Sequence, residues 1–315
     1  MSDIPNVSVV MPAYNTGHTI AEAIRSVLEQ TEGDFELVIC NDASTDHTVE
    51  IVRSFADRRI RLIENPENWG EGRTRDQAIF AARGHWLAVL DADDAWAPLR
   101  LERLLAAVQG HGDEMVFDDI MTCHDTPHGL MPWRALRGKA AFGTRGSSAR
   151  PIRFADYLRA ERLLIKPLIP RRVVADNGVT HSRRRFGADT EFFVRLAHLG
   201  LAMVYLPEPH YLYRVTPGSA TAVARGAHLM RECIEECAEL GWEDAAVREA
   251  FQWKITSLRQ NEMLYELAGY GKAKSLGKAI RLIARNPQLL RVLPRRLARH
   301  LAYQGDRLWH GGRNR

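Results

Sequence analysis

Three aspartates lie within four positions at the end of the segment LAVLDADDAW, residues 87–96. The apolar run that leads into Asp91, Asp93 and Asp94 is typical of a buried strand. Carboxylates this close together raise one another's pKa unless positive charge lies among them. Mg²⁺ and Mn²⁺ prefer oxygen ligands, and Mg²⁺ commonly combines one or two carboxylates with substrate phosphates. The spacing therefore predicts a divalent cation beside a phosphate-containing substrate.

The elements that must position these aspartates alternate between strands and helices. Apolar patterning predicts strands over residues 7–11, 35–40, 59–64 and 85–90, and helices over 19–30, after Asp46, over 73–82 and from Pro98. This alternation favours an α/β fold, with a mostly parallel sheet covered by helices on both faces. Ligands of such sheets bind outside the carboxyl ends of the strands. Polar residues at four successive strand ends should therefore converge on one edge: Tyr14, Asn15, Asn41, Asp42, Asn65, Asn68, Gly70 and the three aspartates.

Beyond residue 115 the alternation is less regular. Strands are predicted over 116–120 and 202–206 and a helix over 188–199, whereas residues 122–150, rich in Gly, Pro, His and Arg, are expected to be irregular. The chain after residue 219 has a wholly helical pattern. We therefore expect one sheet-containing domain over 1–218, with a regular part over about 1–115 and a less regular part over about 116–218. A helical region over 219–315 follows it.

Composition and missing motifs exclude several classes of protein. The chain has 315 residues, of which 45% are hydrophobic and 26% charged, as in ordinary globular proteins. No apolar run approaches the ~18–20 residues of a membrane span, and no signal-peptide pattern opens the chain, which favours a cytoplasmic protein. Neither a GxxxxGK[ST] motif nor a GxGxxG after the first strand occurs, which disfavours NTPases and dinucleotide enzymes. The four cysteines lack zinc-ligand spacing and are expected to be packing thiols.

Four segments in order resemble one enzyme family: VSVVMPAYN, ELVICNDASTD, NWGEGRTRDQA and LAVLDADDAW. They resemble the inverting glycosyltransferases of family 2, which have the Rossmann-like GT-A fold and serve bacterial polysaccharide and exopolysaccharide synthesis. The resemblance covers roughly residues 5–215. It implies that the domain over 1–218 is the catalytic domain, with a nucleotide-sugar half over about 1–115 and an acceptor half over about 116–218. Because the family transfers a sugar from a nucleotide diphosphate, it implies a nucleotide-sugar donor, with a UDP-hexose favoured, and Mn²⁺ or Mg²⁺ as the cofactor.

The resemblance also implies a donor site. Asp91 and Asp93 match the family's DxD pair, with Asp93 as the metal ligand, and Arg75 matches the arginine of its G…ARN segment. That segment reads GEGRTRD here, so Thr74 and Asp76 depart from the family pattern. The donor-binding residues implied are Pro12, Ala13, Tyr14, Asn15, Asp42, Gly70, Arg75, Asp91 and Asp93.

An inverting transfer also needs a base that takes the proton of the acceptor hydroxyl. In FGADTEFFVRLAHLG (186–200), Asp189 resembles the family's catalytic aspartate, and Arg195 lies where the family usually has an arginine. Ala188 replaces the glutamate that often precedes this aspartate. Glu191 is the alternative base and an acceptor-side candidate, and Asp189 could instead merely cap a helix.

Two further residues are candidates for substrate contacts. Arg214 lies in YLYRVTPGSAT (211–221), which resembles the family's donor-closing segment, although Thr216 stands where that segment often has His. Arg214 could stabilise the departing diphosphate, or it could form a surface ion pair. Trp133 could stack on an acceptor sugar, or it could belong to the core.

The C-terminal segment is strongly basic. Residues 271–315 carry three Lys, nine Arg and one Asp, a net charge of +11, so the first 270 residues carry −7 of the total +4. Leu289, Leu293, Leu297 and Leu301 alternate with Arg291, Arg295 and Arg299 on opposite helix faces, with Pro294 at a kink or a helix start. Such a helix could lie on an anionic membrane surface, or pack on the catalytic domain or a second subunit. Nucleic-acid binding is disfavoured because no aromatic residues are interleaved.

The sequence thus predicts an inverting, metal-dependent hexosyltransferase. We expect it to extend a lipid-linked saccharide acceptor in the synthesis of a cell-surface polysaccharide or exopolysaccharide. It would act in the cytoplasm, at the inner face of the cytoplasmic membrane if the basic tail binds lipid. Two alternatives stay open: a catalytically silent scaffold that binds saccharide or a partner, and a metal-dependent sugar nucleotidyltransferase. The oligomeric state is left open.

Overall fold

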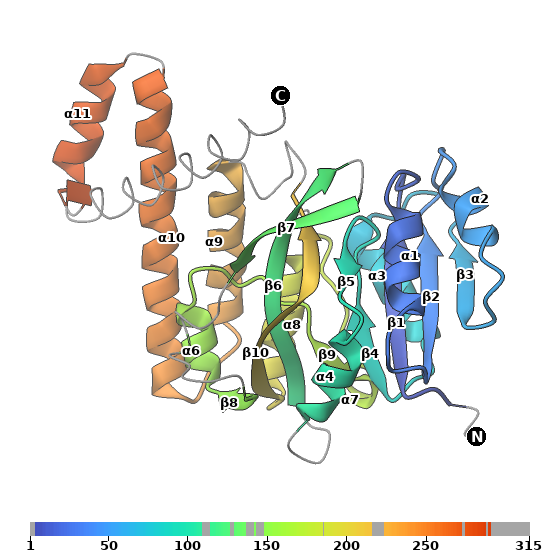
Figure 1. Ribbon diagram of the computed structural model, residues 1–315. Coiled ribbons are helices and arrows are strands. Elements are labelled where there is room, and N and C mark those ends of the chain that lie inside the picture. Colours follow the sequence, from blue (N-terminus) through green and yellow to red (C-terminus); the bar gives the residue numbers. More distant parts are fainter. Residues whose placement is uncertain are drawn as a thin grey trace.

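A computed structural model describes residues 4–108, 114–126, 129–136, 142, 148–184, 186–215, 224–272, 275–287 and 289–290. One mixed sheet runs through it, in the strand order β3-β2-β1-β4-β9-β6-β10-β5, with β7 paired to β6 and β8 to β10 (Figure 1). Strands β1, β2, β3 and β4 are parallel to one another, as are β6 and β10, whereas β5, β7, β8 and β9 pair antiparallel. The bounds of the strands are β1 Val7–Ala13, β2 Phe35–Asn41, β3 Ile60–Glu64, β4 Trp86–Val89, β5 Ala95–Trp96, β6 Glu114–Thr126, β7 Gly129–Leu136, β8 Arg150–Ile152, β9 Leu168–Pro170 and β10 Ala202–Arg214.

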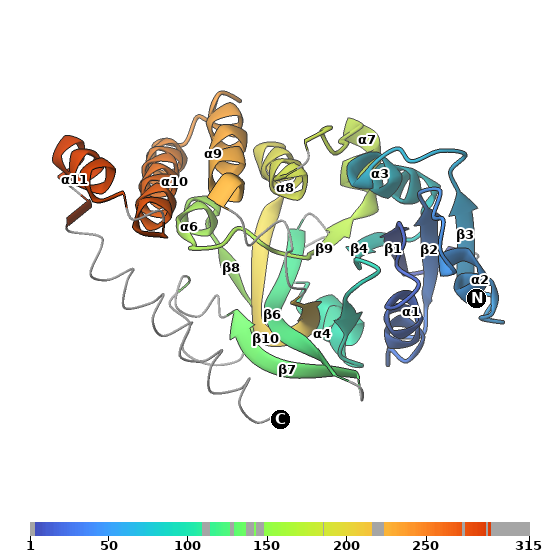
Figure 2. The same cartoon turned by 90° about the horizontal axis from the view of Figure 1, so that it is seen from above.

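Helices cover both faces of the sheet. Seen from above, α3, α7 and α8 lie on one face and α1 and α4 on the other, while α9, α10 and α11 stack outward beyond α8 (Figure 2). The bounds of the helices are α1 Ile20–Leu28, α2 Thr48–Arg53, α3 Glu71–Ala81, α4 Arg100–Ala106, α6 Phe154–Arg159, α7 Arg171–Asn177, α8 Ala188–His198, α9 Ala224–Ala238, α10 Ala245–Lys272 and α11 Leu276–Arg285. No helix in the described part of the chain combines the length and the apolar character needed to span a bilayer.

Strand residues alternate between two hydrophobic cores, one on each face of the sheet. Val10 and Val38 face the core that includes α3 and α8, whereas Val9 and Leu37 face the core that includes α1 and α4. This period of two is what a sheet buried on both faces requires. Ile234 of α9 and Phe251 of α10 belong to the first core, so these two helices pack on the sheet domain rather than apart from it. The predicted boundary near residue 218 stays a prediction.

The α/β prediction is confirmed, and the structure corrects it in detail. Residues 122–126 and 129–136 are not irregular, because β6 extends to Thr126 and pairs antiparallel with β7. Pro132 lies in β7 at a shift of register, where a strand tolerates the missing N–H. Pro98 precedes α4 instead of opening it, and His47 rather than Asp46 is the N-cap residue of α2.

Two predictions fall on residues without a described structure. Residues 137–141 and 143–147, part of the segment expected to be irregular, lie outside the described residues. The leucine and arginine stripes of the basic tail also lie there, apart from Leu289, which is buried.

Candidate active site

The aspartate loop follows β4 at the carboxyl edge of the parallel strands, as predicted. Its three carboxylates present oxygen atoms that all lie within 4.8 Å of one another. The buried Asp94 accepts hydrogen bonds from the hydroxyl of Tyr211 and from the backbone N–H of Arg214, both at 2.8 Å. The backbone N–H of Asp91 donates to the same tyrosine oxygen at 3.3 Å. Strand β10 therefore fixes the conformation of the loop that carries the aspartates.

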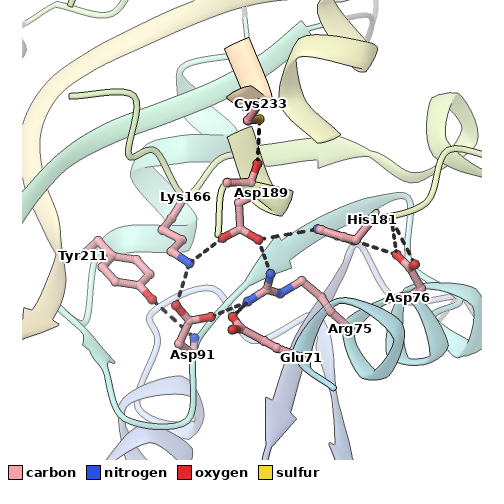
Figure 3. Close-up of polar contacts among 10 residues, drawn as sticks. Glu71, Arg75, Asp76, Asp91, Lys166, His181, Asp189, Tyr211 and Cys233 are labelled. Atoms are coloured by element: carbon pink, nitrogen blue, oxygen red, sulfur yellow. Dashed lines mark hydrogen bonds and ion pairs between the residues drawn. The ribbon is translucent and has the colours of Figure 1, made fainter. Parts of the chain in front are cut away.

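Two buried cations lie between Asp91 and Asp189 (Figure 3). The guanidinium of Arg75 contacts Asp91 at 3.0 Å and also donates to Asp189. The ammonium of Lys166 contacts Asp91 at 2.6 Å and Asp189 at 3.3 Å. The structure therefore brings together Asp91, Arg75 and Asp189, three residues that the sequence places far apart, and adds Lys166, which the sequence analysis missed.

These contacts set the charge state of the site. Burial alone would raise the pKa of Asp91 and of Asp189, but the charges of Lys166 and Arg75 outweigh it and hold both pKa values below the usual range. Burial and the neighbouring Asp91 raise the pKa of Asp93. The sequence led us to expect a metal ion as the positive partner of the aspartates. At Asp91 the protein itself supplies positive partners, namely Arg75 and Lys166, whereas the side chains of Asp93 and Asp94 have no such ion pair among the described residues.

Asp189 lies in the first turn of α8, yet it does not cap the helix. The N-cap residue is Gly187, with a φ of 87° that favours glycine, and no side chain caps the helix. The side chain of Asp189 is 28% exposed and points to Arg75 and Lys166. Glu191, the alternative base, is held instead by Arg184 at 3.1 Å and by Arg195 at 3.5 Å.

The structure explains why Asp76 stands where the family's G…ARN segment has another residue. Asp76 accepts hydrogen bonds from the backbone N–H of His181 and lies 2.6 Å from its Nδ1. The buried imidazole stacks on Phe192 and places Nε2 3.7 Å from Asp189. The carboxylate of Asp76 therefore binds His181 and holds its imidazole beside Asp189. Nothing in the sequence singled out His181.

The nucleotide-binding candidates lie at the ends of β1 and β2. Pro12 and Ala13 are the last residues of β1, and the exposed Tyr14 follows them. Asn15, with a φ of 52°, accepts the backbone N–H of Thr45 at 2.8 Å, which ties the first loop to the second.

Asp42 organises the third loop of this edge. It accepts the backbone N–H groups of Trp69 and Gly70 at 2.8 and 2.9 Å and the side chain of Asn65 at 2.9 Å. Burial would raise the pKa of Asp42, but these hydrogen bonds hold it below its usual range. Gly70 has a φ of 85°, which only glycine adopts readily, so its presence at the start of α3 is a backbone requirement.

Two further candidates, Arg214 and Trp133, lie on β10 and β7. The guanidinium of Arg214 donates to the backbone carbonyl of Asp93 at 2.6 Å and is paired with Glu22 and Asp125. Arg214 therefore holds the backbone of the aspartate loop in place, and its ion pairs are part of this arrangement rather than an isolated surface pair. Trp133, half-buried on β7, packs against the ring of His124 with centroids 4.7 Å apart.

Comparisons with known proteins agree with this geometry. The family model described as Glycosyl transferase family 2 matches residues 8–155. The succinoglycan biosynthesis protein ExoO of Rhizobium meliloti is 28% identical over 98% of this chain and 89% of its own length. The Escherichia coli protein WfgD, a UDP-Glc:alpha-D-GlcNAc-diphosphoundecaprenol beta-1,3-glucosyltransferase, is 44% identical over 96 residues, which are 30% of this chain and 38% of WfgD.

Solved structures share the fold. TarS of S. aureus, residues 1–349, superposes with a TM-score of 0.63 at 18% identity, covering 90% of this chain and 91% of that one. The mannosyltransferase PcManGT of Pyrobaculum calidifontis, solved with GDP-Man and Mn²⁺, gives a TM-score of 0.57 at 20% identity, covering 98% and 88%. At these identities the likeness shows the fold alone. Together with the family model matched over residues 8–155 and the relatives above, it shows that the chain has a GT-A fold and is similar to glycosyltransferases of family 2, with relatives in polysaccharide biosynthesis.

Proposed function

We propose that this protein is an inverting glycosyltransferase that moves a hexose from a UDP-sugar to a saccharide acceptor, lipid-linked, in cell-surface or exopolysaccharide synthesis. The observation that carries the proposal is the placement of Asp189 opposite Asp91, with Arg75 and Lys166 between them. The name of WfgD specifies a UDP-glucose donor and a diphosphoundecaprenol acceptor, and TarS has been solved with UDP and with UDP-GlcNAc. These relatives support the choice of donor and acceptor.

The donor occupies the edge formed by β1, β2 and β4. Asp42 binds the nucleoside, and the loop after Pro12 encloses it, as the family resemblance implies. Arg75 places a positive charge beside Asp91, where the diphosphate and the sugar meet. Positive charge fixed in advance stabilises the negative charge that develops as the nucleotide diphosphate leaves.

The aspartate loop fits a divalent cation. Both oxygens of Asp94 and both of Asp91 already accept hydrogen bonds, which leaves the exposed Asp93 as the ligand. Desolvation by the surrounding loop and the charge of Asp91 raise the pKa of Asp93, and a cation bound there would favour its ionised form. When bound, Mn²⁺ or Mg²⁺ supplies charge neutralisation for the diphosphate and makes it a better leaving group.

Asp189 takes the proton of the acceptor hydroxyl. Arg75 and Lys166 keep its pKa low against the effect of burial, so the carboxylate is ionised at working pH and able to accept a proton. A base of low pKa is a weak one. It is sufficient here because the attacking hydroxyl becomes strongly acidic as its oxygen bonds to the anomeric carbon and the diphosphate departs.

The base assignment predicts a selective loss of rate. Asp189→Asn keeps the shape of the side chain but cannot accept the proton, so turnover should fall by about 10²–10⁴-fold, with a much smaller change in donor Kd. Turnover by rapid assay and donor Kd by calorimetry check this. The control is Asp156→Asn, which removes a carboxylate that also lies in the first turn of a helix but is paired with Arg153 instead of Arg75 and Lys166.

The same measurements on a second variant decide whether another residue is the catalytic base. Near-normal turnover of Asp189→Asn, together with a collapse in Glu191→Gln, would transfer the role to Glu191. Near-normal turnover of both variants would remove this segment from the chemistry.

The metal assignment predicts cation-dependent donor binding. Mn²⁺ or Mg²⁺ should increase the rise in melting temperature that UDP-hexoses produce, because a ligand at 100 times its Kd stabilises by about 2.7 kcal/mol. EDTA or Asp93→Ala should abolish this increase while leaving the melting temperature of the free protein nearly unchanged. Equal donor-induced shifts with Mn²⁺ and with EDTA would contradict the metal role.

We also propose that the protein acts at the inner face of the cytoplasmic membrane. On α11, Ile280 is 57% exposed, and Lys278, Arg281 and Arg285 are exposed on the same short helix. Apolar side chains beside basic ones suit an anionic lipid surface, and residues 271–315 carry a net charge of +11. A lipid-linked acceptor would be presented at that surface.

Charge reversal on α11 tests this placement. Changing Lys278, Arg281 and Arg285 together to Glu should weaken binding to vesicles that contain anionic lipid by at least about 100-fold, at about 1 kcal/mol per basic residue. Co-sedimentation with anionic and neutral vesicles measures the change. Reversal of Arg25, Arg53 and Arg58, exposed basic residues on or next to α1 and α2, is the matched control. If both triple variants bind as the native protein does, α11 makes no membrane contact.

A further inference from the structure

Lys166 is a buried lysine that neither the family motifs nor the predicted base accounts for. It lies just before β9 and is 3% exposed. Arg100 of α4 donates a hydrogen bond to its backbone carbonyl and forms a buried ion pair with Asp118 of β6 at 2.9 Å. The backbone at Lys166 is therefore attached to two rigid elements. Burying an ammonium costs free energy unless the charge is paired, so the partners of Lys166 indicate why the lysine is there.

The contacts of Lys166 and Arg75 form a closed ring (Figure 3). Arg75 donates to Oδ1 of Asp91 and to Oδ1 of Asp189. Lys166 donates to Oδ2 of Asp91 at 2.6 Å and to Oδ2 of Asp189 at 3.3 Å. Each carboxylate is thus held at both oxygens, which prevents its rotation. Without Lys166, Arg75 would hold each carboxylate at one oxygen.

We infer that Lys166 is a positioning residue for glycosyl transfer, which orients the carboxylate of Asp189 and sets its distance from the donor-side Asp91. The inference rests on the proposed function, because it needs Asp189 as the base. It assigns the ammonium a task that a structural ion pair does not have, namely to point one particular lone pair at the acceptor.

The ring also identifies the oxygen that accepts the proton. Oδ1 of Asp189 faces Arg75 and lies 3.7 Å from Nε2 of His181. Among the described residues, Oδ2 contacts Lys166 alone. Oδ2 therefore keeps a free lone pair, and Lys166 determines its direction. Misorientation of a reacting group by about 1 Å can cost on the order of 10²-fold in rate.

The experiment is a double-mutant cycle between Lys166→Met and Asp189→Asn, with turnover, donor Kd and melting temperature measured for each variant. We expect Lys166→Met alone to lower kcat by about 10–100-fold. In the Asp189→Asn background the same change should lower kcat by less than about 3-fold, because Lys166 acts through Asp189. Donor Kd should weaken in both backgrounds alike, through the lost contact with Asp91.

Lys254→Met is the matched control. Lys254 is also 3% exposed, but its ammonium donates to the backbone carbonyls of Ala160 and Glu161, away from the site. It should lose stability without losing kcat. If Lys254→Met lowers kcat as much as Lys166→Met does, the effect is one of stability and the inference is wrong.

Additive losses would also overturn the inference. If Lys166→Met lowers kcat equally in both backgrounds while Asp189→Asn alone collapses turnover, the base stands and only the positioning role of Lys166 fails. If the turnover of the Asp189→Asn single variant is near normal, both the proposed function and the positioning role of Lys166 are wrong. Should the Met variant not fold, Lys166→Gln, which keeps a hydrogen-bond donor, replaces it in the same cycle under the same criteria.

Discussion

Two carboxylates that lie 98 residues apart in the sequence, Asp91 and Asp189, share the same two buried cations. Asp91 follows β4 and Asp189 lies at the start of α8, and Arg75 and Lys166 join them. Removing either cation would leave two negative charges facing each other in a partly buried site, which is unfavourable unless one of them takes a proton. The pairing of these two carboxylates with the two cations, with the exposed Glu71 as a third partner of Arg75, is the constraint that the surrounding structure must satisfy.

Much of the fold can be understood as support for this ring of charges. Tyr211 and Arg214 on β10 hold the aspartate loop, and the Arg100–Asp118 pair holds the chain at Lys166. Buried ion pairs contribute little net stability when desolvation is counted, so such pairs are best explained by the geometry that they fix. A site that must align a donor sugar and an acceptor hydroxyl needs that rigidity.

The sequence revealed the parts of the site that occur in local motifs. Asp91, Asp93, Arg75 and Asp189 were predicted because each lies in a segment with recognisable spacing. Lys166 was missed because a single lysine before a proline has no local pattern, and its role exists only once four separate elements come together. The β6–β7 pairing was missed because its proline and glycine suggest a loop, whereas an edge strand tolerates both.

The configuration of the product tests the central claim most directly. A base at Asp189, opposite the donor-side Asp91, implies one displacement in which the acceptor attacks the face that the diphosphate does not occupy. NMR of the first-formed product, made from a nucleotide sugar of known anomeric configuration, should show the inverted configuration at the transferred sugar. A product that retains the configuration of the donor would contradict direct attack assisted by Asp189.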